Sequence, residues 1–126
     1  MGKMQRRKGH SYERQFAAWF RERWEALGVT AKRGWQSRGG GKEEADVETF
    51  LNGEPLPFHW ELCRAKKPSV WAKYKQAQDD CDEGEIPIVV VRRDREEARV
   101  FLSLTDFEVF IDLFIKKKLE EQKEGV

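Results

Sequence analysis

The fold of this chain is decided by two extended stretches, Ala45-Asp46-Val47-Glu48-Thr49-Phe50-Leu51 and Phe58-His59-Trp60-Glu61-Leu62-Cys63-Arg64. The turn-rich segment 52–57 joins them and predicts that the second stretch folds back beside the first. That pairing brings Asp46 and Glu61 together, where two like charges are tolerated when a cation lies between them. Carboxylate oxygens suit Mg²⁺, with Mn²⁺ as a substitute, and such a site supports phosphodiester cleavage.

Hydrophobic spacing predicts the elements around this pair. A first helix is expected from Ser11, as its N-cap, to about Leu27; its buried stripe is Tyr12, Phe16, Phe20, Trp24 and Leu27. A strand is expected over 29–35 and a helix over 70–83, with Trp71, Tyr74 and Cys81 facing inward. Further strands are expected over 86–92 and 99–104. Thr105, with Glu108 three residues on, predicts the cap of a last helix over 106–121.

Composition and length indicate one α/β domain. The 126 residues suffice for one sheet-and-helix core, in the order αβββαββα. We expect residues 1–9 to be a flexible basic arm, 10–121 the domain and 122–126 a tail. No apolar run approaches the roughly 20 residues that span a bilayer, and the basic N-terminus lacks the apolar stretch of a signal peptide. Two cysteines make no disulfide framework, so we expect a cytoplasmic protein without a membrane partner.

Positive charge is concentrated near the N-terminus, although the whole chain carries only +1. Between Lys3 and Lys42 stand eleven basic and three acidic residues, a net charge of +8. This excess precedes the predicted metal site and favours contact with a phosphate backbone. The candidate DNA-binding residues are Lys3, Arg6, Arg7, Lys8, Arg14, Lys32, Arg33, Arg38 and Lys42.

Asp, followed by Glu-x-Lys on the next strand, is the signature of the PD-(D/E)XK nuclease superfamily. From about Gly9 to Phe114 the chain resembles its small archaeal-type Holliday-junction resolvase branch. The matching motifs, in order, are Gly9-His10-Ser11-Tyr12-Glu13-Arg14, Arg38-Gly39-Gly40-Gly41-Lys42, Asp46 with Glu61, Gln76-Ala77, and Ile86-Pro87-Ile88-Val89-Val90-Val91. The resemblance implies a restriction-endonuclease-like mixed β-sheet flanked by helices.

The resemblance also implies roles for single residues. Asp46, Glu61 and the backbone carbonyl of Cys63 would hold Mg²⁺, with Glu13 reaching in from the first helix and Gln76 approaching from a later one. Cutting two opposed strands of a junction implies a homodimer. The last helix offers two apolar stripes, one for the sheet and one for a subunit interface: Phe107, Phe110, Ile111 and Phe114, and Val109, Leu113 and Ile115.

Cys63 departs from the family pattern, because it stands at the position of the motif lysine. A thiol carries no positive charge, and a thiolate beside two carboxylates is disfavoured. Two origins stay open, a natural small buried residue or a substitution that disables the enzyme. A replacement cation would come from Arg64 or Lys66 through a bulge, or from Lys73 or Lys75 on the neighbouring helix.

The function expected from these residues and the resemblance is a metal-dependent, structure-selective DNA endonuclease. Its substrate would be branched DNA, the four-way Holliday junction of recombination and repair, in a prokaryotic or phage-infected cell. Two alternatives stay open. One is a junction- or DNA-binding protein without catalysis, and the other is a nuclease of the same fold acting on flaps, ends or single strands.

Overall fold

The computed structural model describes residues 2–34 and 45–125, with side chains from Ser11 onward. These residues form three α-helices and a six-stranded mixed sheet. The strands are β1 (Val29–Arg33), β2 (Val47–Leu51), β3 (Glu54–Pro55), β4 (Phe58–Arg64), β5 (Ile86–Arg92) and β6 (Arg99–Phe101). The helices are α1 (Gly2–Trp24), α2 (Val70–Asp80) and α3 (Leu104–Glu124), and a 3₁₀ turn, η1 (Glu25–Leu27), follows α1. A mixed α/β fold is therefore confirmed, with the two-residue β3 added to the expected order.

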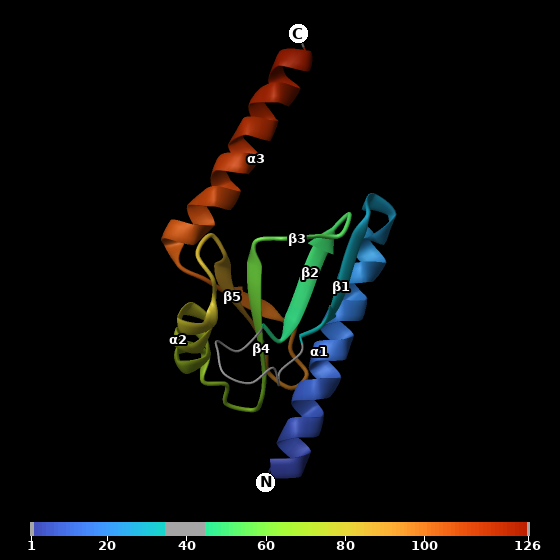
Figure 1. The fold of residues 1–126 in the computed structure, drawn as a ribbon. Coiled ribbons are helices and arrows are strands. Elements are labelled where there is room, and N and C mark those ends of the chain that lie inside the picture. Colours follow the sequence, from blue (N-terminus) through green and yellow to red (C-terminus); the bar gives the residue numbers. More distant parts are fainter. Residues whose placement is uncertain (1, 35–44, 126) are drawn as a thin grey trace.

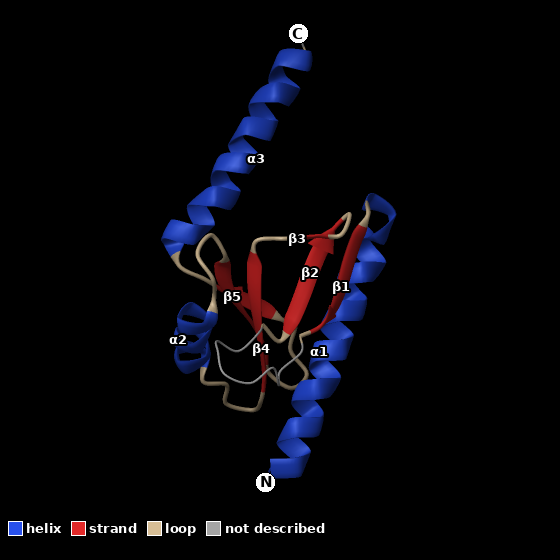
Figure 2. Ribbon diagram, viewed as in Figure 1, coloured by secondary structure: helices blue, strands red, loops and turns tan. Residues whose placement is uncertain are grey.

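The sheet runs β1-β2-β4-β5-β6, with β3 paired to β2 (Figure 2). Strands β4 and β5 are parallel, and every other pair is antiparallel. The parallel pair is joined by α2, as a crossover between parallel strands requires. Buried apolar residues fill most of β5, which matches a strand covered on both faces.

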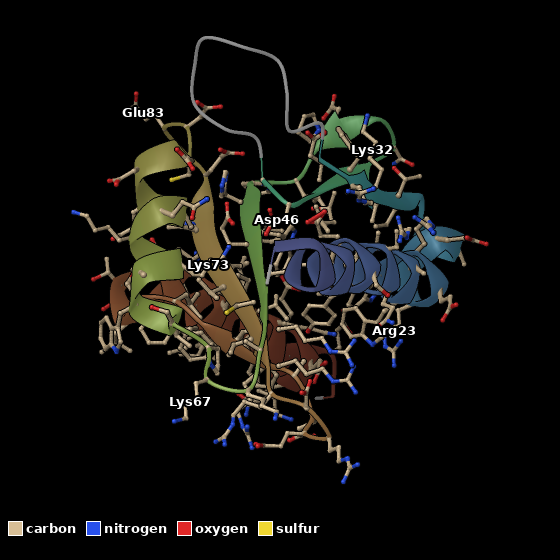
Figure 3. The ribbon with its side chains drawn as sticks, turned by 90° about the horizontal axis from the view of Figure 1, so that it is seen from below. Arg23, Lys32, Asp46, Lys67, Lys73 and Glu83 are labelled. Carbon is tan, nitrogen blue, oxygen red and sulfur yellow. The ribbon has the colours of Figure 1, made fainter. Side chains whose placement is uncertain are left out.

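Helices α1 and α2 cover opposite faces of the sheet (Figures 1 and 3). On the α1 face, Phe16 and Phe20 pack with Trp60 and Leu62 in the larger apolar cluster. On the α2 face, a smaller cluster joins Cys63, Tyr74 and Val89. Because side chains alternate along β4, Glu61 and Cys63 share one face, while Trp60 and Leu62 point to the other. This alternation is the one that the sequence predicts.

The first helix begins at Gly2, so its expected start at Ser11 is wrong, and residues 2–9 of the expected basic arm belong to this helix. Ser11 lies inside the helix, where its Oγ accepts a hydrogen bond from Gln15 Nε2. Residues 3–8 are mostly good helix formers, and Gly9 costs only about 1 kcal/mol in a helix that is already nucleated. At the other end Leu27 is exposed in η1 instead of buried.

The second helix ends at Asp80, three residues before the expected end, and turns a different face to the sheet. Tyr74 and Ala77 are buried, but Trp71 is 76% exposed and Cys81 is half-buried. The expectation that Trp71 faces inward is therefore wrong. Its ring instead lies edge-on against Phe101 at the rim of the sheet, 4.9 Å between centroids.

The last helix stands away from the rest of the protein (Figure 1). No α3 residue is buried, and only its first turns touch the body, where Phe110 stacks on Phe58. The expected packing of a whole stripe on the sheet is wrong, because α3 starts beyond the end of the strands. Its N-cap is Ser103, whose Oγ accepts from Asp106 N, instead of Thr105, and the helix continues to Glu124 through the expected tail.

A close backbone contact, which we call the clamp, joins Gly34, where the first described segment stops, to Ala45 and Asp46, where the second begins. Gly34 N donates to Asp46 O at 2.9 Å, and a Cβ on Gly34 would overlap the carbonyl oxygen of Ala45. A glycine is needed here because no side chain fits between the two segments. The clamp fixes the backbone of Asp46 against the end of β1. None of the helices in the described ranges is both long and apolar enough to cross a membrane.

Candidate functional site

Asp46 stands directly across from Glu61 at the start of β2. Its backbone N donates to Trp60 O at 2.9 Å, and its Oδ2 accepts from Leu62 N at 2.8 Å. Asp46 therefore holds the residues on both sides of Glu61. The predicted approach of the two carboxylates is confirmed, and it follows from the antiparallel pairing of Val47 with Trp60. Their role in catalysis stays a prediction.

Burial and repulsion dominate the electrostatics of Asp46. Burial, then the charge of Glu61, raises its pKa from 3.8 to about 7, and Glu13 adds to the rise. The hydrogen bond from Leu62 N and the charge of Lys73 act in the opposite direction. A carboxyl with this pKa holds a proton at neutral pH about half of the time unless a cation replaces it. The site therefore has affinity for positive charge.

Among the described residues, Glu61 is the most deeply buried charged one, with 1% of its surface exposed. Its Oε1 lies 3.2 Å from His59 Nε2, whereas its Oε2 is buried without a hydrogen-bond partner among the described residues. A buried carboxylate oxygen without a partner is costly, because it loses water and gains nothing in return. This oxygen is the natural ligand position for a cation.

His59 is a buried neighbour of Glu61 that the sequence reasoning did not assign to the site. Burial alone lowers its pKa, but the hydrogen bond and charge of Glu61, then the charges of Glu85 and Asp80, outweigh burial and raise the pKa above its usual value. Period-two alternation, which puts positions 59 and 61 on one face, is the signal that would have found it. Asp80, Glu85 and His59 also line a cavity of about 500 Å³.

Glu13 reaches the site from α1, as the sequence predicts. It is buried, its charge acts on Asp46, and its Oε1 accepts from Arg33 Nε at 3.2 Å. Its position inside a helix explains how a charged residue comes to lie there, since Tyr12 and Phe16 beside it pack into the core. Arg33 is thus tied to Glu13 instead of being fully exposed.

Cys63 lies on the Glu61 face under the first turn of α2, in contact with Tyr74 and Val89. Burial raises the pKa of the thiol, and Asp46 raises it further, while Lys73 and the amide of Ser69 lower it. The raised pKa keeps this thiol neutral at pH 7. Cys63 therefore supplies no positive charge at the position where the family pattern has a lysine.

The other predicted site residues are more dispersed. Gln76 is half-buried on α2, next to the side of that helix that faces β4. Arg14 and Lys32 are exposed, and Lys32 Nζ lies 5.3 Å from the centre of the Phe50 ring. The side chains of Lys3, Arg6, Arg7 and Lys8 lie outside the described residues, although their backbone belongs to α1, and Arg38 and Lys42 lie outside entirely.

The donor set fits one divalent cation held by two carboxylates. Asp46 and Glu61 converge from paired strands, and Glu61 Oε2 lacks another partner in the described structure. Among the side chains of residues 11–34 and 45–125, no three from His, Cys, Asp or Glu converge to hold an ion. Mg²⁺ commonly takes only one or two protein carboxylates and completes its shell with water and phosphate oxygens.

Comparison of the chain with family models, with curated proteins and with solved structures gives no match. The function proposed below is therefore based on the geometry of the site and on the sequence motifs.

Proposed function

We propose that the protein is a Mg²⁺-dependent, structure-selective DNA endonuclease of restriction-endonuclease-like fold that resolves four-way junctions. The observation that carries this proposal is the buried Asp46–Glu61 pair, in which Glu61 Oε2 has no partner among the described residues. A protein gains no stability from two buried like charges. Such a pair is therefore best explained by a bound cation.

The position of the pair supports the same reaction class. Asp46 immediately precedes β2 and Glu61 lies within β4, and the charge of Glu13 acts on Asp46 from α1. This is the arrangement that the motif order of the resolvase branch implies. It is reached here through backbone contacts, since Asp46 binds the amide that follows Glu61.

Each of the chain's own groups has a defined task in this mechanism. Glu61 and Asp46 would hold the cation, and His59 restrains the Glu61 side chain through the 3.2 Å contact between His59 Nε2 and Glu61 Oε1. A bound divalent cation would stabilise negative charge on the phosphate and activate water. In the reaction the water oxygen bonds to phosphorus, the bond to the leaving sugar oxygen breaks, that oxygen takes a proton from solvent, and the proton of the attacking water passes to solvent.

The N-terminal basic residues supply the proposed hold on DNA. Seven of the eleven basic residues between Lys3 and Lys42 belong to the sequence of α1. Helix α1, whose sequence carries this charge, extends past the sheet at its N-terminal end and is the proposed phosphate-binding element (Figure 1). Contacts of this kind depend on salt and carry little sequence preference.

We also propose that α3 forms the interface of a two-fold dimer. Its exposed apolar residues include six from the two stripes, Phe107, Val109, Ile111, Leu113, Phe114 and Ile115, together with Leu104 and Leu119. The first half of α3 holds Asp106, Glu108 and Asp112 as its charged residues, whereas the second half holds the run Lys116, Lys117 and Lys118, followed by Lys123 and three glutamates, Glu120, Glu121 and Glu124. Two copies packed antiparallel set these opposite charges against each other while burying the apolar residues.

The interface is tested by placing a charge in it. We expect Leu113→Glu to convert a dimer into a monomer in analytical ultracentrifugation, because an unpaired charge in an apolar interface is costly. Gln122→Glu adds the same charge at a polar, exposed position of α3 and should leave the dimer intact. A wild-type protein that is monomeric at micromolar concentration contradicts this interface.

The nuclease proposal is tested by incubating the protein with Mg²⁺ and a labelled four-way junction, beside linear duplex, a flap and a single strand. We expect paired cuts near the branch point, and their loss in Asp46→Asn and Glu61→Gln with junction binding retained. The control Glu48→Gln changes a carboxylate two residues from Asp46. Cleavage retained by Asp46→Asn would show that the active site lies elsewhere.

A second candidate, a junction-binding protein without catalysis, is favoured by Cys63. Its thiol is buried and neutral, so the position of the motif lysine carries no charge. Tight binding of a junction by the wild type, with no cut in any of the four DNAs in Mg²⁺ or Mn²⁺, would support this candidate over the nuclease.

A further inference from the structure

Among the described residues of β4, the α2 face holds His59, Glu61 and Cys63 but no lysine or arginine, and His59 is already in contact with Glu61. Glu61 and Cys63 point to this face, and Asp46 meets them from β2. A phosphate group brought next to two carboxylates is repelled by them, and a cationic side chain besides any metal reduces that repulsion. The nearest element from which such a group can come is α2, which packs over this face.

One row of side chains on α2 lies along β4 at the site. Lys73, Ala77 and Asp80 recur at helical spacing, and Ala77 is fully buried against the sheet. Helix α2 runs antiparallel to β4, as the crossover to the parallel strand β5 requires. Asp80 accordingly acts on His59 near the start of β4, while Lys73 lies over its end.

Lys73 lies between α2 and the site. Figure 3 shows it on the side of α2 that is turned toward β4 and Asp46. Its side chain is half-buried, whereas Lys75, two residues on, is exposed. Its charge lowers the pKa of both Asp46 and the Cys63 thiol, so the ammonium group is in electrostatic reach of both. Lys75 acts on neither of them.

The small size of Cys63 explains how α2 comes so close. Tyr74 packs on Cys63, and the Ser69 amide at the helix start is hydrogen-bonded to the thiol. A long side chain at position 63 would occupy the space over which Lys73 extends. The cysteine on the strand and the lysine on the helix are therefore complementary, because one leaves the space that the other uses.

We propose that Lys73 supplies, from α2, the positive charge that Cys63 does not provide, and that it contacts the scissile phosphate of DNA bound at Asp46 and Glu61. This inference rests on the proposed nuclease function and assigns the missing cationic group of that site. It also makes the neutral Cys63 compatible with an active enzyme. A lysine on a helix reaches the phosphate as a single point charge, which suits a phosphate oxygen.

The inference is tested with four variants in single-turnover cleavage of the junction. Lys73→Met keeps the length of the side chain and removes its charge, and we expect cleavage at least about tenfold slower, a difference of roughly 1.4 kcal/mol in the barrier. Lys73→Arg should retain most activity. The matched control Lys75→Met removes the same charge from the exposed side of α2 and should cleave like the wild type.

The fourth variant moves the charge from the helix to the strand. Cys63→Lys combined with Lys73→Met should recover cleavage to within about threefold of the wild type, since the vacated space accepts the new side chain. A merely structural role of Lys73 predicts no such recovery. Thermal unfolding of all four variants checks that each of them is folded.

A second readout needs neither metal nor cleavage. In EDTA, the slope of log affinity for the junction against log salt should fall by about 0.9 in Lys73→Met, because one phosphate contact is lost, and stay unchanged in Lys75→Met. Wild-type cleavage that persists at full rate in Lys73→Met, or an unchanged slope, overturns the role of Lys73 alone. A wild type that cuts no DNA overturns the nuclease proposal and this role together.

Discussion

The two faces of β4 bury different kinds of side chain, although both are formed by alternate residues of the same strand. On the α1 face, Trp60 and Leu62 are packed among aromatic rings, with Phe16 5.1 Å from Trp60 between centroids. On the α2 face, His59, Glu61 and Cys63 bury titratable groups instead. The apolar face stabilises the strand, and that stability allows the opposite face to hold groups that oppose folding.

The largest expected effect comes from breaking the apolar face. Trp60→Ala should lower the free energy of unfolding by about 3–5 kcal/mol, because it leaves a cavity among three aromatic contacts and deletes the bond from Nε1 to Thr49 Oγ1. Urea unfolding followed by circular dichroism measures this. A loss no larger than that of Trp71→Ala, at an exposed tryptophan, would contradict the assignment of the core.

The charged face should make the metal-free protein less stable as pH rises. Asp46 keeps its proton up to about pH 7 in the folded state but releases it near 3.8 when unfolded. Its contribution to stability is therefore present at low pH and lost between about pH 4 and 7. His59, whose pKa is also raised, contributes in the same direction.

We expect the unfolding free energy in EDTA to fall by a few kcal/mol between pH 5 and 8, at 1.36 kcal/mol for each unit of pKa shift. Asp46→Asn should flatten this dependence and be more stable than the wild type at pH 8. A dependence that is equally steep in Asp46→Asn would place its origin in other groups.

Divalent cations should reverse that loss. At pH 8, Mn²⁺ at 100 times its dissociation constant should stabilise the wild type by about 2.7 kcal/mol, and by less at pH 5, where protons compete. Differential scanning fluorimetry measures the shift in melting temperature. Glu61→Gln should show little shift, and an undiminished shift in this variant would place the ion outside the Asp46–Glu61 pair.

The smallest expected effect concerns the polar contact within the apolar face. Thr49→Val preserves shape but leaves Trp60 Nε1 without its acceptor, a bond of 3.2 Å. We expect a loss of about 1 kcal/mol in urea unfolding and no change in the pH dependence of stability. Thr30→Val, at an exposed threonine of β1, provides the control. A change in the pH dependence would show that the two faces are coupled.

The central strands were predictable because their signals are local and strong. The limits expected for β4 and β5 agree with the structure, and the alternation of side chains along a strand sets Glu61 and Leu62 on opposite faces, as found. The meeting of Asp46 and Glu61 followed from a short connection that permits only an antiparallel return. The stacking of Phe58 on Phe110 depends on tertiary packing and carries no such local signal.

The helix ends were not predictable, because competing local signals were equivalent. Ser103 with Asp106 and Thr105 with Glu108 are two capping patterns two residues apart, and the end of β6 at Phe101 decides between them. The start of α1 was misplaced for another reason, because the N-terminal residues are polar helix formers without an apolar periodicity. The exposure of α3 depends on where the last strand stops, which hydrophobic periodicity does not report.

The clamp between Gly34 and Ala45 fixes the position of Asp46 through backbone atoms. Asp46 is held by backbone contacts to Gly34 and Trp60. Gly34 leaves no room for a Cβ beside Ala45, so a side chain at position 34 would displace the backbone that carries the carboxylate. A single residue without a side chain thus keeps Asp46 in register with Glu61.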